Sequence, residues 1–129
     1  MIGSELRSDR SGRALRAATL GLGLVLAAAV AGAHQLSADD VIARLRAPAA
    51  REAYDVVDVE RHPGLPRMLL VRVGERWRTL PAERRREAAE DWLRAWRHAV
   101  AQGVVSILDV QTGRAVVNFD ARGNALVRP

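Results

Sequence analysis

WRTLPAERRREAAEDWLRAWRHAVAQG, residues Trp77–Gly103, is the one long stretch of this chain with unambiguous helical periodicity. On a wheel of 3.6 residues per turn its apolar side chains gather within an arc of roughly 140°. They are Ala88, Ala89, Trp92, Leu93, Trp96, Ala99 and Val100. The opposite side carries Glu87, Glu90, Asp91, Arg94, Arg97 and His98. We therefore expect one amphipathic helix that packs on a hydrophobic core.

The ends of this predicted helix carry ordinary boundary signals. Thr79 is the expected N-cap, and Pro81 falls in the first turn, where its missing N–H costs nothing. Gly103 is expected to end the helix in the left-handed conformation. Trp92 and Trp96 on the inner side should each bury on the order of 200 Å², so they dominate the predicted core.

Composition limits the chain to one domain held together by packing. Its 129 residues suit a single core, and because it has no cysteine it can form neither a disulfide nor a thiolate metal site. All 20 basic residues are arginine. Acids and arginines are interleaved along most of the chain, whereas a nucleic-acid-binding protein concentrates its positive charge. We therefore predict no nucleic-acid partner.

The N-terminal segment 1–33 has the layout of a signal peptide. Arginines at positions 7, 10, 13 and 16 precede the uncharged run 17–33, which ends in Ala-Gly-Ala. Cleavage is expected after Ala33, with cleavage after Ala31 as the near alternative. An uncleaved inner-membrane anchor is the second alternative, since the run is short for a span of about 20 residues. We thus predict a periplasmic or secreted bacterial domain of residues 34–129, exported by the general secretory route.

Residues 34–129 alternate between helix and strand signals. Leu36–Arg46 starts with a capping-box pair, Ser37 and Asp40, and should form a short helix that Pro48 breaks. Gly113 supplies the positive φ needed in the turn of a hairpin. Strands are predicted at Tyr54–Glu60, Met68–Val73, Val104–Val110, Arg114–Phe119 and, as a short edge, Ala125–Val127.

This order, α-β-β-α-β-β with a possible fifth strand, predicts an α+β fold. The long helix should pack on a mostly antiparallel four- or five-stranded sheet. A crossover through the helix makes the second and third strands parallel if they are neighbours. Alternation places Val57 and Val59 on one face of the first strand, and Ala115, Val117 and Phe119 inward in the fourth. The predicted core comprises Leu69, Val71, Trp92, Leu93, Trp96, Val100, Val117 and Phe119.

Metal binding would have to rely on histidine. Cleavage after Ala33 would make His34 the N-terminus, where the α-amine and a ring nitrogen can bind one Cu(II) ion. This resembles the copper sites of secreted copper-binding proteins and of polysaccharide monooxygenases, which need a further histidine nearby. His62 lies in a proline-rich loop and His98 on the polar helix face, so the sequence does not bring them together. Copper binding through His34 is the alternative function, and no other cofactor is predicted.

Nucleophilic catalysis has little support. Ser37 and Ser106 are the only serines after residue 33, and Ser37 is better explained as a helix cap. Asp109 lies near Ser106, but no spacing supports a triad. Glu90 and Asp91 diverge by about 100° on a helix, so they do not converge as acid and base must. We predict no catalytic residue, and a small envelope enzyme without a known motif is a further alternative.

A partner-binding surface is predicted around four residues, namely His62, Trp77, Arg84 and Arg85. Trp and Arg are enriched at binding hot spots. Two simpler interpretations are favoured: Trp77 closes the end of the core near the helix start, and arginines 84–86 form a solvated, ion-paired first turn. Farther along the helix, Glu90 is placed to pair with Arg94.

Residues 109–123, DVQTGRAVVNFDARG, are similar to the closing hairpin of PepSY-type extracytoplasmic domains. The resemblance covers these fifteen residues, and it implies a binding or regulatory module. The Trp-rich helix has no counterpart in that pattern, so the resemblance assigns no family. The sequence as a whole predicts a non-catalytic exported domain that binds a protein or envelope partner.

Overall fold

Five strands form one mixed sheet in the computed structural model, which describes residues 36–129. Neighbouring strands are antiparallel except β2 and β3, which run parallel, and this confirms the predicted fold class and crossover. The predicted signal peptide and His34 lie outside the described residues. In sheet order the strands are β1 (Val56–Arg61), β2 (Met68–Val73), β3 (Val104–Asp109), β4 (Ala115–Phe119) and β5 (Ala125–Val127).

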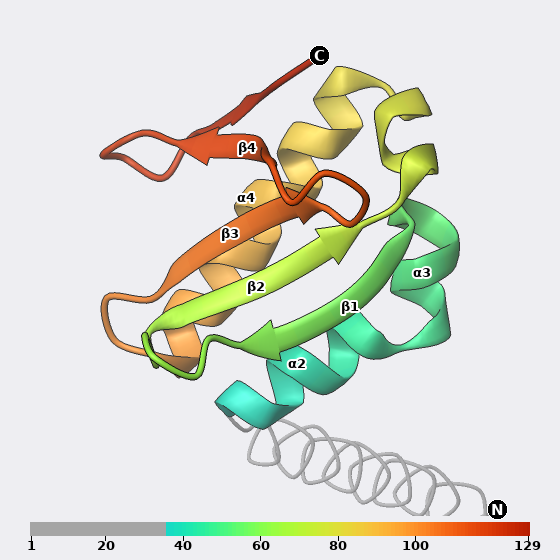
Figure 1. Ribbon diagram of the computed structural model, residues 1–129. Coiled ribbons are helices and arrows are strands. Elements are labelled where there is room, and N and C mark those ends of the chain that lie inside the picture. The colour runs from blue at the N-terminus through green and yellow to red at the C-terminus, as the bar shows by residue number, and fades with distance from the viewer. Residues whose placement is uncertain (1–35) are drawn as a thin grey trace, which may run out of the picture. The chain divides into compact units, whose positions relative to one another are not determined.

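Three α-helices of the described part lie on one face of this sheet, α2 (Ala38–Arg46), α3 (Pro48–Tyr54) and α4 (Ala82–Ala99) (Figure 1). The predicted capping box starts α2, where Ser37 Oγ accepts from the Asp40 amide at 3.2 Å. Helix α3 was not predicted. Pro48 follows the end of α2 and lies in the first turn of α3, where its missing N–H costs nothing.

The predicted Trp77–Gly103 helix was too long at its start. Residues Glu75–Thr79 form a separate 3₁₀ turn, η2, and Leu80 is extended with ψ 149. The residue before a proline is driven out of the helical region, so Pro81 prevents η2 from continuing into α4. Thr79 is not the N-cap, since its hydroxyl donates to the Arg76 carbonyl at 2.7 Å.

The end of this helix also differs from the prediction. Gln102, with φ 56, adopts the left-handed conformation that was assigned to Gly103. Gly103 is needed for space instead, because a Cβ there would lie 2.6 Å from Cδ1 of Trp96. The indole N–H of Trp96 donates to the Arg67 carbonyl at 2.7 Å. The chain entering β3 therefore passes directly against the Trp96 ring.

The core fills the space between the helices and the sheet. Trp77 and Trp92 lie 5.7 Å apart by ring centroid, and Tyr54 meets Trp92 edge-on at the same separation. Trp77 is fully buried, so it belongs to the core, and its Nε1 has no hydrogen-bond partner in the described part. Buried in the core are Leu69, Val71, Leu93, Trp96, Val100 and Val117, while Phe119 is partly buried.

Two irregularities change which side chains face inward. A bulge in β1 makes Val57 an extra residue, so Val56 and Val59 are buried while Val57 is 43% exposed. The prediction that Val57 and Val59 share a face was therefore wrong. A second register shift, between β3 and β4, places Val116 and Val117 together in the core.

Candidate binding site

An apolar pocket of 400 Å³ lies between α2, α3 and α4. Its floor includes Val41 and Leu45 of α2 and Trp92 of α4, all buried. Its sides are mostly alanine, supplied by Ala49, Ala50 and Ala53 of α3 and by Ala88 and Ala95 of α4.

The pocket exists because α3 does not fill the space beside α4. No residue of α3 is fully buried. Alanine has too short a side chain to bridge neighbouring helices, so the three alanines of α3 leave room above Trp92. Tyr54, at the end of α3, closes one side by packing on Trp92. The result is a concave apolar surface with an aromatic floor, a feature typical of ligand and partner sites.

Charged groups mark the rim of this apolar pocket. Arg44 lines it, and the guanidinium of Arg84 lies 5.3 Å from the centre of the Tyr54 ring. Neither arginine forms an ion pair with a residue in the described range 36–129. The lining also contains Asp91, which pairs with Arg94 at 2.7 Å. The lining therefore contains one arginine and one aspartate, and Arg84 and Arg94 add positive charge beside it.

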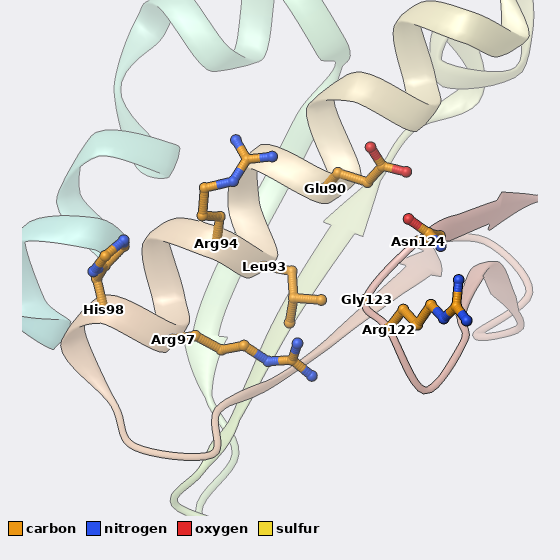
Figure 2. A pocket seen from close by; sticks show the side chains of 8 residues that line it. All are labelled: Glu90, Leu93, Arg94, Arg97, His98, Arg122, Gly123 and Asn124. Atoms are coloured by element: carbon orange, nitrogen blue, oxygen red, sulfur yellow. The ribbon is translucent and has the colours of Figure 1, made fainter.

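A second cavity, of 330 Å³, lies between the second half of α4 and the turn joining β4 to β5 (Figure 2). Arg94, Arg97 and His98 reach it from α4, and Arg122 reaches it from the turn. Glu90 does not pair with Arg94 as predicted. Its carboxylate accepts from the Ala125 amide at 3.1 Å, while Arg94 bonds to Asp91.

The structure separates the residues of the predicted partner-binding surface. Arg85 is only 8% exposed, and its guanidinium donates to the Leu80 and Arg128 carbonyls, each at 3.1 Å. The expectation of a fully solvated arginine run was therefore wrong for Arg85. His62 Nδ1 accepts from the Gly64 and Leu65 amides at 3.0 Å, which fixes the β1–β2 loop.

The remaining chemical candidates also have structural roles. Ser37 caps α2, and the register of β3 directs Ser106 and Asp109 to opposite sheet faces. Asp109 accepts from Arg78 at 2.5 Å and from the Gln111 amide at 2.9 Å. Within residues 36–129, no group of three or more His, Cys, Asp or Glu side chains could hold a metal ion. Copper binding through His34 stays a prediction.

No protein-family model, curated protein or solved structure matches this chain. Among the described helices, none combines the length and apolar character needed to cross a bilayer. Sequence reasoning missed both cavities. The alanines of α3 could have indicated an apolar pocket. The prediction instead treated the segment around Pro48 as a break in the helix. The second cavity joins residues of α4 to a distant turn, and local periodicity does not report such contacts.

Proposed function

We propose that this chain is an exported, non-catalytic domain that binds a protein partner through the apolar pocket. The observation that carries the proposal is the recess itself, 400 Å³ of mostly apolar space on one side of α3. A small domain rarely leaves concave apolar surface open unless it is used, because burying that surface would stabilise the fold. Export is supported by the signal-peptide layout of residues 1–33.

The occupant that fits best is a bulky apolar side chain of the partner, flanked by an acidic residue. The Trp92 floor and alanine sides favour apolar or aromatic groups. Arg44 and Arg84 on the rim favour an acidic neighbour, because opposite charges across an interface improve both its specificity and its rate of formation. The proposed partner therefore presents an apolar anchor beside a carboxylate.

The non-catalytic part of the proposal has its own support. Among residues 36–129, Asp91 is the one carboxylate that lines the apolar pocket, and it is paired with Arg94. General acid–base chemistry needs at least one converging second group within hydrogen-bond reach of the reacting atoms. The other polar side chains of the described lining are Arg44 and Tyr54, and neither forms a hydrogen bond with Asp91.

Photo-crosslinking in cells that export the chain tests this proposal. A photoreactive residue at exposed Ala49 in the pocket wall should give a defined crosslinked product. The same residue at Ala101, an exposed alanine after α4, is the matched control and should not. Equal labelling from the two positions, or no product from Ala49, would contradict the proposal.

A charge reversal shows whether the crosslink depends on the rim. Arg44→Glu should reduce the Ala49 product by about tenfold, as expected when a favourable charge contact becomes repulsive. Arg51→Glu is the control, since Arg51, like Arg44, is a basic residue in the last turn of its helix but does not line the apolar pocket. A similar decrease in both variants would show that the pocket is not the binding surface.

A further inference from the structure

We infer that the second cavity, between α4 and the β4–β5 turn, is an oxyanion site that binds a phosphoryl group. Both cavities are lined in part by α4, but no described residue lines both, and the second is completed by the β4–β5 turn instead of α2 and α3. The inference therefore does not depend on the proposed partner. Figure 2 shows Arg97 reaching from α4 toward the turn that carries Arg122 and Gly123.

The first argument is the charge balance of this cavity. Neither Arg97 nor Arg122 forms an ion pair with any residue of the described part. Arg94 is neutralised by Asp91. The cavity's own carboxylate, Glu90, is already engaged by the Ala125 amide. Arg97 and Arg122, which stay charged at every physiological pH, therefore line this cavity with one carboxylate, Glu90, whose charge the Ala125 amide does not neutralise, so the cavity keeps a net positive charge.

The second argument is that Arg97 is held in place. Its Nε donates to the Gly103 carbonyl at 3.1 Å, and this leaves the two terminal nitrogens available. Gly123 has φ 85, and a Cβ added there would lie 3.0 Å from Nη1 of Arg97. A side chain at position 123 would crowd the guanidinium. Glycine therefore serves both the turn conformation and the close approach of the charged group.

The backbone at Arg122 is ordered by the turn on which it lies. The Asp120 carboxylate accepts from the Arg122 and Asn124 amides, each at 2.9 Å, and also from the Asn124 side chain at 3.1 Å. The Gly123 amide donates to the Asp120 carbonyl at 3.0 Å. These bonds order the turn before a ligand arrives, so the backbone loses little conformational entropy on binding.

The chemistry of the two arginines defines the ligand class. Guanidinium groups match phosphate oxygens with paired N–H donors, and a phosphoryl group offers two such groups about three acceptor oxygens where a carboxylate offers about two. A cavity of 330 Å³ suits a phosphate or a phosphorylated small group. A free phosphate ester and a phospholipid headgroup present the same oxyanion.

The test is a titration of the exported chain, labelled with ¹⁵N, against inorganic phosphate at low ionic strength. The amides of Arg122 and Gly123 should shift with a saturable dependence on phosphate. Arg97→Gln and Arg122→Gln should each weaken binding by at least about tenfold, as expected for loss of a charge-assisted hydrogen bond. Arg114→Gln removes an exposed arginine of the β3–β4 turn and should change affinity by less than about twofold.

Other probes separate the possible sources of the oxyanion. Binding to vesicles containing phosphatidylglycerol, lost in the Arg97 and Arg122 variants, assigns the phosphoryl group to a lipid headgroup and supports the inference. Saturable binding of acetate without phosphate binding overturns the phosphoryl assignment. Equal weakening by Arg114→Gln, or shifts spread over the whole surface, overturns the site. Unchanged melting temperatures establish that the variants are folded.

Discussion

Trp96→Phe should destabilise the domain by about 2 kcal/mol, whereas Trp77→Phe should be neutral or stabilising. Both tryptophans are fully buried, so both changes remove the same atoms from equally dry surroundings. The smaller ring leaves a void of roughly 40 Å³, which costs about 1 kcal/mol at 24 cal/mol per Å³. The two positions differ in what happens to the indole N–H.

At Trp96 the N–H donates to the Arg67 carbonyl at 2.7 Å, and losing this bond adds about 1 kcal/mol. At Trp77 the N–H is buried without a partner among the described residues, so phenylalanine removes a group whose desolvation costs about 1–3 kcal/mol. That gain offsets the cost of the void. The two variants should therefore differ by about 2 kcal/mol or more.

Urea unfolding followed by far-UV circular dichroism measures this difference without relying on tryptophan fluorescence. Thermal melts should agree, with a separation of about 4–8 °C per kcal/mol for a domain of this size. If Trp77→Phe is as destabilising as Trp96→Phe, the Trp77 N–H has a hydrogen-bond partner. The assignment of their different roles would then be wrong.

Three further predictions rest on local contacts. Gly103→Ala should cost roughly 1–3 kcal/mol in urea unfolding because its Cβ would overlap Trp96, while Gly64→Ala, whose nearest neighbour would be 3.5 Å away, should change stability by less than about 0.5 kcal/mol. Glu90→Ala should speed hydrogen exchange at the Ala125 amide by about tenfold or more because it loses its acceptor, and Glu87→Ala on the same helix should not. The pKa of Asp120 is held below its ordinary value of 3.8 by the backbone amide of Asn124 and then by its side-chain amide, so the folded chain binds fewer protons there than the unfolded chain. That stabilisation is present above pH 3.8 and is lost as the pH falls through 3.8 toward the folded pKa, so Asp120→Asn should flatten the acid limb of a stability-versus-pH curve.

The fold class was accessible from the sequence because its strongest signals are local and periodic. The inner face of α4, the capping box at Ser37 and the turn glycine at 113 each depend on neighbours a few residues away. Such signals depend little on the tertiary context. The parallel pairing of β2 with β3 was predicted from the order of the elements along the chain.

The missed features depend on contacts between distant segments. The burial of Trp77 agrees with the favoured interpretation, but its contact with Trp92 was not predicted. Arg85 is buried because the segment after β5 brings the Arg128 carbonyl to its guanidinium. The bulge at Val57 has no signature in a run of alternating residues. Both cavities are formed by segments that local patterns treat separately, so the candidate sites became visible only in three dimensions.

The parallel pairing of β2 with β3 also constrains the order of folding. The β1–β2 and β3–β4–β5 units are each formed by neighbouring segments, so their ladders close short loops and can form early. The pairing of Met68 with Val104 can form only after η2 and α4, which connect β2 to β3, have packed across the sheet. Until then β2 and β3 present open edges to other chains. In a chain that crosses a membrane unfolded, β2 and β3 would have open edges on the far side until α4 packs. Packing of α4 is therefore the step at which aggregation competes with folding.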